Sequence, residues 1–225
     1  MNRVFEEWLA FLFVVVMGVA ISPLRAVTAG APLKEKPADG RWTSLFDGRS
    51  LGQWRVVDQY DFSRHGKVYV KDGRLILEAG SPGTGVRWTG EFPKINYELV
   101  YEAMRVEGGD FFGSLVFPVG DKQLALILGG WSGNVVGVSN INGEAAVENE
   151  SAQSVRFQNN RWYRVRLRVT QEAIRVWIDE EKLVDVPNKD REFAIWWEQE
   201  PLLPLGLHTW YTTGAIRGIR LRRVE

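Results

Sequence analysis

The sequence predicts an all-β protein built from two antiparallel sheets. One long stretch alternates between apolar and polar positions, which is the pattern of half-buried strands. Apolar runs also flank Asp-Gly pairs, the strongest short-range signal for a β-hairpin. Beyond the N-terminal segment no stretch has helical periodicity, and short strands recur at regular spacing. These features favour a sandwich or a barrel over an α/β fold.

The alternating stretch covers residues 162–186 and is predicted to form a hairpin. Pairing Val169 with Ile174 sets every apolar residue of one strand against an apolar residue of the other, and a slip by one residue would turn one apolar set outward. On the outer face the pairs are Arg166 with Trp177, Arg164 with Asp179, and Arg168 with Arg175. The last pair is unfavourable, so we expect a neighbouring carboxylate or a ligand to relieve it.

The remaining strands are placed by apolar runs and turn residues. Strands at residues 67–71 and 74–78 flank Asp72-Gly73, and residues 80–90 are expected to be a loop because they contain four Gly and one Pro. Further strands are predicted near residues 44–48, 96–106, 111–119, 123–128, 135–140, 193–197, 205–208 and 215–224. No internal repeat or second linker occurs, so residues 41–225 are interpreted as one domain.

The N-terminus is interpreted as an export signal. Arg3 is followed by an apolar run over residues 8–21 and then by small residues. The run is shorter than the ~20 residues of a membrane-spanning helix. We predict a signal peptide at residues 1–29 and a linker at 30–40, with an uncleaved anchor as the alternative. The absence of Cys excludes disulfides and suits a secreted, periplasmic or cell-envelope protein stabilised by its core.

The composition narrows the class of partner. Lys plus Arg and Asp plus Glu number 28 each, so no general attraction to nucleic acid or to an anionic membrane is expected. With no Cys and two His, a Cys nucleophile and a His-rich zinc site are both excluded. Ten Trp is a high number for this length. Such rings fill sandwich cores and also form the flat surfaces on which sugars stack, so a carbohydrate is the expected ligand.

Several motifs resemble those of the 3-keto-disaccharide hydrolase family. They are Ser44-Leu45-Phe46-Asp47-Gly48-Arg49-Ser50-Leu51 with Trp54, Lys71-Asp72-Gly73-Arg74-Leu75, Trp88-Thr89, Arg161-Trp162-Tyr163, Trp177-Ile178-Asp179 and Gly214-Ala215-Ile216-Arg217-Gly218-Ile219-Arg220-Leu221. The resemblance covers residues 41–224 and implies a concanavalin A-like jelly roll, a fold shared with laminin G-like domains and many glycan-binding lectins. It further implies exported proteins that act on oxidised disaccharides or glycosides at the concave face of the sandwich.

The family resemblance also directs attention to the segment before the last strand, where members carry polar residues, often including His, after a Gly-Leu step. Here Gly206-Leu207 leads to His208-Thr209-Trp210. His208 is therefore the candidate base, and Trp210 places an aromatic ring where another polar group is common. A ring beside a titratable group suits a sugar ligand. The alternative is that His208 is a buried structural residue of the sandwich.

Carboxylates supply the other catalytic candidates. Glu198 and Glu200 are chosen because alternate residues of a strand share a face, and Pro201 is expected to place them at a strand end. Any charged sheet face produces such pairs, which is the simpler interpretation. Asp110 lies between Gly109 and Phe111 and is the candidate ligand for a divalent metal, with a role in shaping the turn as the alternative.

Sugar-binding candidates gather around residues 130–142. Trp131 would supply an aromatic platform, and Asn134, Asn140 and Asn142 carry amides that can make paired hydrogen bonds to sugar hydroxyls. The alternative is that these Asn residues are turn residues that tolerate positive φ.

Three functions remain open from the sequence. The first is an enzyme that cleaves or hydrates 3-keto-glycosides, in which a base removes the proton beside the ketone and a divalent metal or a cationic group stabilises the enolate. The second is a non-catalytic glycan-binding module that uses the Trp and Asn side chains. The third is a structural envelope domain without a small ligand.

Overall fold

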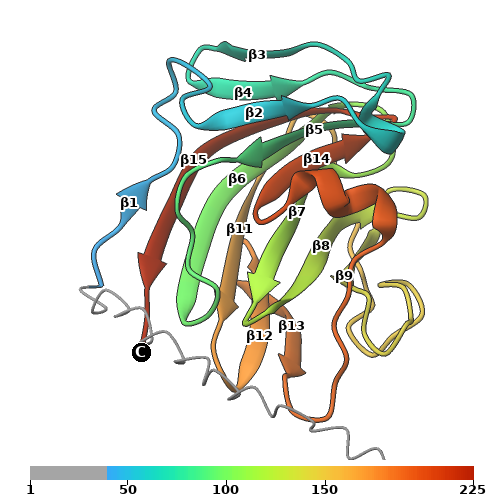
Figure 1. Cartoon of the computed structure of the whole chain (residues 1–225). Helices are drawn as coiled ribbons and strands as arrows, with labels where there is room; N and C mark the ends of the chain where they lie inside the picture. Colours follow the sequence, from blue (N-terminus) through green and yellow to red (C-terminus); the bar gives the residue numbers. More distant parts are fainter. Residues whose placement is uncertain (1–39) are drawn as a thin grey trace, which may run out of the picture. The chain divides into compact units, whose positions relative to one another are not determined.

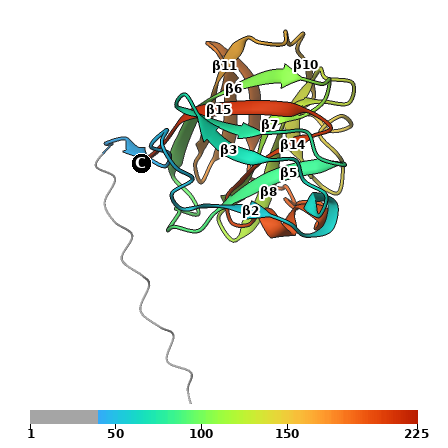
Figure 2. The same cartoon turned by 90° about the horizontal axis from the view of Figure 1, so that it is seen from above.

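The computed structural model describes residues 40–225, which form a sandwich of two antiparallel sheets (Figure 1). One sheet has eight strands and the other has seven, and the helices among the described residues are two short 3-10 turns. Seen from above, the sheets lie as two layers (Figure 2). The predicted all-β sandwich is thereby confirmed. The predicted signal peptide at residues 1–29 and nearly all of the linker at 30–40 lie outside the described residues.

The eight-stranded sheet follows the order β13-β12-β11-β6-β15-β4-β3, and β1 pairs with β15. Its strands are β1 (Thr43–Ser44), β3 (Val68–Lys71), β4 (Arg74–Leu77), β6 (Tyr97–Glu107), β11 (Trp162–Val169), β12 (Ala173–Ile178), β13 (Glu181–Pro187) and β15 (Thr213–Arg223).

The seven-stranded sheet follows the order β10-β9-β8-β7-β14-β5-β2. Its strands are β2 (Trp54–Val57), β5 (Gly83–Trp88), β7 (Phe112–Val119), β8 (Lys122–Gly130), β9 (Val135–Ser139), β10 (Gln153–Ser154) and β14 (Gly206–Trp210). The 3-10 helices η1 (Tyr60–Phe62) and η2 (Trp197–Leu202) lie against the face of this sheet that points away from the other sheet (Figure 1).

The main hydrophobic core fills the space between the sheets, because each strand turns alternate side chains inward. The long strands β6 and β11 contribute buried residues such as Leu99, Val165 and Leu167. The seven-stranded sheet is also covered on its second face, where a smaller cluster comprises Val57, Phe62, Val116, Ala125, Ile127, Ala146 and Leu202. Burial on both faces explains the continuous apolar character of β7 and β8, as the sequence predicted.

The central hairpin has the register that its alternation predicts. β11 and β12 pair Val169 with Ile174, Leu167 with Val176, and Val165 with Ile178. Arg168 faces Arg175 in this register. Neighbouring strands supply a carboxylate to each, because Glu98 lies 3.9 Å from Arg168 and Asp185 lies 3.0 Å from Arg175. The repulsion between the two arginines is thus relieved from both sides of the hairpin.

Residues 80–90 were expected to be a loop, and this expectation is wrong. Residues 83–88 form β5, which pairs with β14 on one side and with β2 on the other. A Cβ on Gly83 would lie 2.7 Å from the Phe62 ring, and one on Gly85 would lie 2.8 Å from a Leu202 methyl. These glycines therefore allow η1 and η2 to lie close on the strand, whereas Gly in a sequence is usually a turn signal.

The strand predicted at residues 193–197 is also wrong. Phe193 forms an isolated bridge with Ile141, after which the chain leaves the sheet and turns into η2. Pro201 within η2 and Pro204 after it lack the N–H groups that a ladder strand donates. Glu198 and Glu200 thus lie on a 3-10 helix and do not share a strand face.

Among residues 40–225, none forms a helix that is long and apolar enough to cross a membrane.

We predict that Gly83→Ala destabilises the domain by about 1–3 kcal/mol, because the added methyl overlaps the buried Phe62 ring. The measurement is urea unfolding followed by tryptophan fluorescence. Gly109→Ala is the matched control, since its Cβ would meet nothing within 4 Å. Equal loss of stability in both variants would contradict the close approach of η1 to β5.

Candidate functional site

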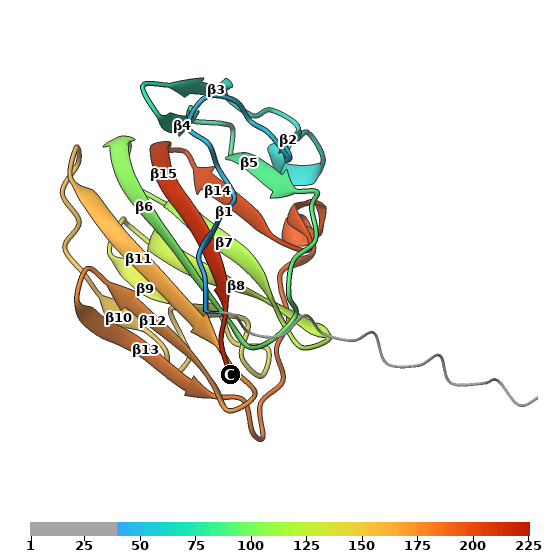
Figure 3. The ribbon, with the colours of Figure 1, turned by 90° about the vertical axis from the view of Figure 1, so that its left-hand side faces the viewer.

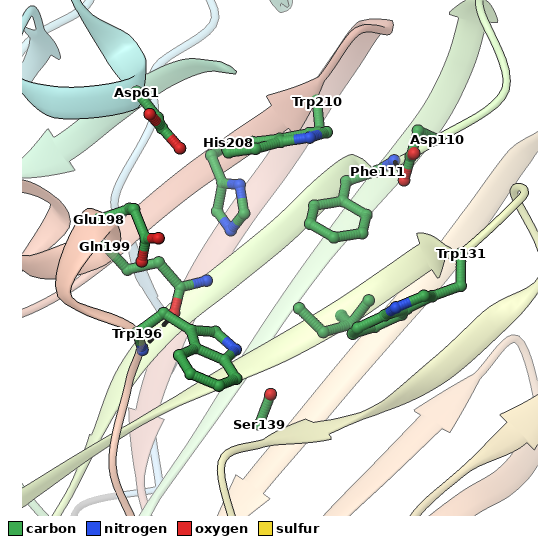
Figure 4. Close-up of a pocket in the computed structure, with 11 residues that line it drawn as sticks. Asp61, Asp110, Phe111, Trp131, Ser139, Trp196, Glu198, Gln199, His208 and Trp210 are labelled. Carbon is green, nitrogen blue, oxygen red and sulfur yellow. Dashed lines mark hydrogen bonds between the residues drawn. The ribbon is translucent and has the colours of Figure 1, made fainter. Parts of the chain in front are cut away.

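A cavity of about 470 Å³ lies on the outer face of the seven-stranded sheet (Figure 4). The 3-10 helices wall one side, and the ends of β7, β8 and β14 wall the other. The lining residues are Asp61, Asp110, Phe111, Ile127, Trp131, Ser139, Trp196, Glu198, Gln199, His208 and Trp210. Its size falls in the range of roughly 300–1,000 Å³ that is typical of small-molecule sites.

A bulge in β7 sets which side chains face the cavity. β14 and β7 pair with a register shift between His208 and Thr209, so that Gly113 is an extra residue on β7. Because side chains alternate along a strand, this extra residue brings Phe111 onto the same face as His208 and Trp210. The Phe111 ring lies 5.8 Å from the His208 ring and 6.0 Å from the Trp210 ring, measured between centroids.

His208 forms part of the cavity wall and is almost fully buried, with 1% of its surface exposed. Its ring also packs edge-on against Phe62 at 5.9 Å. Neither Nδ1 nor Nε2 has a hydrogen-bond partner among the described residues. Burial among aromatic rings lowers the pKa of His208 from 6.5 to about 3. The imidazole is therefore neutral at physiological pH and presents one N–H donor and one acceptor without a protein partner.

Three carboxylates line the cavity, and no Lys or Arg is among its lining residues. The Oε2 atom of Glu198 is buried and has no hydrogen-bond partner among the described residues. Asp110 is half-buried, and this burial raises its pKa, although the N–H of Phe111, which donates to its Oδ1 at 2.9 Å, opposes the rise. Asp61 lies on η1 at the opposite end of the cavity (Figure 4).

Tryptophan rings form much of the remaining wall. Trp131 and Trp196 are 40% and 43% exposed, and Trp210 is partly buried between Phe62 and Phe111. In Figure 4, Trp196 and Trp131 lie on either side of the space below His208. A partly open cavity between aromatic rings offers flat apolar surfaces beside polar groups, which is the combination that a sugar ring needs.

Arg105 holds the turn that carries Trp131. Its guanidinium donates from Nη1 to the Gly133 carbonyl at 3.2 Å, from Nη2 to the Phe157 carbonyl at 2.9 Å, and from Nε to Asn159 Oδ1 at 2.7 Å. Trp131 itself adopts a φ of 43°, a left-handed conformation that costs energy in a residue of this size. Arg105 is thus a positioning residue for the Trp131 ring.

The structure brings together only some of the residues that the sequence proposed. Trp131, Asp110, Glu198, His208 and Trp210 all line the cavity, and the remaining candidates, Glu200, Asn134, Asn140 and Asn142, do not. Glu200 lines a separate depression near Arg55 and Arg87.

The three Asn candidates have structural contacts. Asn134 is exposed, and its carbonyl accepts from Val155 N at 2.8 Å. The Asn140 side chain accepts from the Ser139 hydroxyl at 2.8 Å, and the Asn142 side chain accepts from Glu192 N at 2.8 Å. Asn142 also has a φ of 52°, as expected of a turn residue.

Sequence reasoning missed six lining residues, namely Asp61, Phe111, Ile127, Ser139, Trp196 and Gln199. The Gly residues of β5 were the available signal for Asp61, because they indicate that another segment lies close to that strand. Phe111 and Ile127 lie in apolar runs that the sequence identified as buried on both faces. The alternation alone does not reveal the bulge that turns Phe111 outward.

A metal site does not fit the residues present. Within residues 40–225 no group of three or more His, Cys, Asp or Glu side chains could hold a metal ion. Asp61, Asp110 and Glu198 approach the cavity from different sides in Figure 4.

We predict that His208→Phe keeps the domain folded and makes its stability less dependent on pH. The folded-state pKa of about 3 lies below the ordinary value of 6.5, so between these values the unfolded chain binds a proton that the folded chain does not. This group alone should reduce wild-type stability by up to about 1.4 kcal/mol for each pH unit below 6.5.

The measurement is urea unfolding of both proteins between about pH 7 and pH 4. At pH 7 the Phe variant should be as stable as the wild type or more stable by about 1 kcal/mol, because it buries no unpaired nitrogen. Parallel stability curves for the two proteins would show that His208 titrates normally and is not buried as a neutral group.

Comparisons with solved structures support the fold. A CBM66 carbohydrate-binding module from Bacillus subtilis is 11% identical, with a TM-score of 0.51 over 76% of this chain and 95% of the module. A Bacillus subtilis protein with a galectin-like fold is 10% identical, with a TM-score of 0.55 over 77% and 90%. A glycosyl hydrolase family 16 protein from Mycobacterium smegmatis is 10% identical, with a TM-score of 0.51 over 77% and 94%. Identities this low establish the fold alone.

Comparison of sequences is more specific about the family. No curated protein matches the chain. The family described as the 3-keto-alpha-glucoside-1,2-lyase-like domain matches residues 41–222, which is nearly the whole of the described sandwich. The resemblance expected from the opening, hairpin and closing motifs is thereby confirmed, and the chain belongs to the family of 3-keto-alpha-glucoside-1,2-lyase-like domains.

Proposed function

We propose that this protein binds the sugar ring of a 3-keto-glycoside in the cavity and cleaves the glycosidic bond by elimination. The observation that carries this proposal is a neutral, buried imidazole in a cavity walled by Trp rings, beside a carboxylate. Within residues 40–225 neither the imidazole nor one oxygen of the carboxylate has a hydrogen-bond partner. Family membership supports this reaction class.

The aromatic walls would hold the sugar ring. A pyranose has an apolar face of C–H groups that stacks on aromatic rings, and its hydroxyls point outward from the ring edge. Trp131 and Trp196 offer partly exposed rings on two sides of the cavity. A ring stacked there would place its edge groups near His208 and Glu198 (Figure 4).

The chemistry follows from the ketone at C3 of the sugar. A ketone acidifies the proton on the adjacent carbon, C2, because the resulting negative charge spreads onto the carbonyl oxygen. When a base removes this proton, the electron pair of the C2–H bond becomes the C1=C2 bond. The bond from C1 to the glycosidic oxygen then breaks, and this oxygen leaves with its electron pair and takes up a proton.

His208 is suited to stabilise the enolate rather than to remove the proton. A base with a pKa of about 3 is too weak for efficient proton abstraction near neutral pH. A neutral imidazole can instead donate its N–H to the ketone oxygen, and burial makes this hydrogen bond stronger than it would be in water. His208 is therefore assigned as the donor to the ketone oxygen.

Glu198 is assigned as the base and Asp110 as the acid. The unpaired Oε2 of Glu198 can accept the C2 proton without first losing a protein partner. Burial raises the pKa of Asp110, which is the direction of shift that a carboxyl acting as the acid toward the leaving oxygen needs. Glu198 and Asp110 lie on opposite sides of the cavity (Figure 4). This separation suits elimination, because the base acts at C2 and the acid acts at the oxygen on C1.

A second function, non-catalytic glycan binding, is favoured by the low pKa of His208. A weakly basic imidazole is an adequate hydrogen-bond partner for a sugar hydroxyl even if no proton is transferred. In this case the same Trp rings would bind an unoxidised oligosaccharide, and no product would form.

Export remains part of the proposal. The predicted signal at residues 1–29 would carry the domain to the periplasm, the cell envelope or the medium. N-terminal sequencing of the protein recovered from a bacterial expression host would test it, with a mature start after Ala29 or Ala31 expected and a start at Met1 contradicting cleavage.

We predict that the full chain converts 3-keto-trehalose or 3-keto-sucrose, and that Glu198→Gln and His208→Phe each lower kcat by about 100-fold or more. The measurement is product formation by liquid chromatography under saturating substrate. Glu200→Gln is the matched control, because Glu200 lies on the same helix but lines a different depression. It should retain wild-type turnover.

The outcomes separate the candidate functions. If either substrate binds without turnover, the function is glycan binding and not elimination. Turnover that survives His208→Phe would remove His208 from the reaction, and the absence of both binding and turnover would contradict the proposal.

A further inference from the structure

The outer face of the eight-stranded sheet carries a regular array of arginines. Figure 3 shows β11, β6 and β15 side by side, and their register places six arginines in two rows that flank β6. The β11 row comprises Arg164, Arg166 and Arg168, and the β15 row comprises Arg217, Arg220 and Arg222. We call these six residues the arginine array. On β11 the arginines alternate with buried residues. On β15 a register shift between Arg217 and Arg220, which are three residues apart, keeps both opposite outward-facing residues of β6, so all six point to the same face.

Within the span of the array, β6 supplies two carboxylates, Glu98 and Glu102. Glu102 lies between Arg164 and Arg217, and it pairs with Arg217 at 2.8 Å. Glu98 lies between Arg168 and Arg222 and forms ion pairs with both. The side chain of Glu98 is 2% exposed, so its charge is covered by the two arginines.

The central position of the array has no carboxylate. Val100 occupies the site between Arg166 and Arg220, and no carboxylate of residues 40–225 forms an ion pair with either arginine. The Arg166 guanidinium instead lies over the Trp177 ring at 3.8 Å, and that of Arg220 lies 5.7 Å from the Trp42 ring. Stacking fixes the plane of a guanidinium and leaves its N–H edge available for a bidentate anion contact.

The arginine array is positively charged, although the chain as a whole has no net charge. Glu98, Glu102 and Glu180, which lies 3.8 Å from Arg164, offset three of the six arginine charges and leave an excess of three, whereas the whole chain has 28 basic and 28 acidic residues. The cavity, on the outer face of the opposite sheet, is lined by three carboxylates and no Lys or Arg. The two outer faces of the sandwich therefore differ in charge, and an anion would be attracted to the array and not to the cavity.

We propose that the arginine array binds an anionic polysaccharide with repeated carboxylates, and that this binding leaves the cavity open. Arg is the side chain best matched to carboxylates, which it contacts through two parallel N–H groups. Arginines two residues apart on a strand are about 7 Å apart, and the two rows lie about 10 Å apart across β6. A repeating array of this kind matches a polymer with repeated charges better than a single small anion.

The Trp rings favour a polysaccharide over a lipid surface. Trp177 and Trp42 each stack with a guanidinium of the array, so these rings are partnered by charged groups, whereas membrane-inserting residues present an apolar face. The array also lies on strands of a sheet and not on a helix of the kind that enters a nucleic-acid groove.

The test is binding of the full chain to polygalacturonate, with dextran as the neutral polymer, by calorimetric titration at low and at physiological salt. We expect binding to polygalacturonate only, weakening as salt increases. The double variant Arg166→Gln/Arg220→Gln should bind about tenfold more weakly or worse. The control Lys122→Gln/Lys189→Gln removes the same charge from exposed positions outside the array and should bind as the wild type does.

Equal affinity of the wild type and the arginine variant, with both shown to be folded by thermal unfolding, would overturn the proposal. Tighter binding to a DNA duplex or to phosphatidylglycerol vesicles than to polygalacturonate would also overturn it. Turnover of keto-sugars is measured separately. Lack of binding to polygalacturonate would therefore not contradict the proposed reaction, and lack of turnover would not contradict polysaccharide binding by the arginine array.

Discussion

The structure depends on one constraint, the period-two alternation of side chains along a β-strand. This alternation decides which residues of each strand face the core. The hairpin of β11 and β12 obeys it along its whole length, so its inner face packs into the core and its outer face carries the arginines. The site depends on a departure from it. The extra residue Gly113 in β7 turns Phe111 outward beside His208 and Trp210. Small glycine residues in β5 then allow η1 and η2 to close the cavity against the same face.

Features set by local patterns could be predicted from the sequence, and features set by contacts between distant segments could not. The register of the hairpin and the turn at Asp72-Gly73 follow from patterns within a few residues, and both are observed. β5 was missed because its glycines serve close packing of Phe62 and Leu202, which are far from it in sequence. The helix η2 was missed because the apolar run over residues 193–197 predicts a strand that ends near Glu198 and Glu200.

The candidate site was predicted in the same uneven way. His208 and Trp210, which share a face of β14, were indicated by the Gly-Leu step of the family resemblance, and Trp131 was indicated by its Gly-rich turn. Asp61 and Trp196 reach the cavity from segments that carry no pattern of their own. The neutrality of His208 depends on the rings of Phe62 and Phe111 around it, and such an environment exists only in the folded chain. We therefore propose His208 as a hydrogen-bond donor and not as the base that the sequence suggests.

The most direct test of this role is nitrogen NMR of the His208 imidazole with and without a 3-keto-glycoside. The chain has two His, so the spectrum is simple, and His65 is exposed and serves as an internal reference. The Glu198→Gln variant would hold the substrate without turnover. We expect His208 to stay neutral between about pH 8 and pH 4 and its N–H signal to shift when the sugar binds, while that of His65 does not. Titration of His208 near 6.5, or a signal that the sugar leaves unchanged, would contradict its assignment as the buried donor to the ketone oxygen.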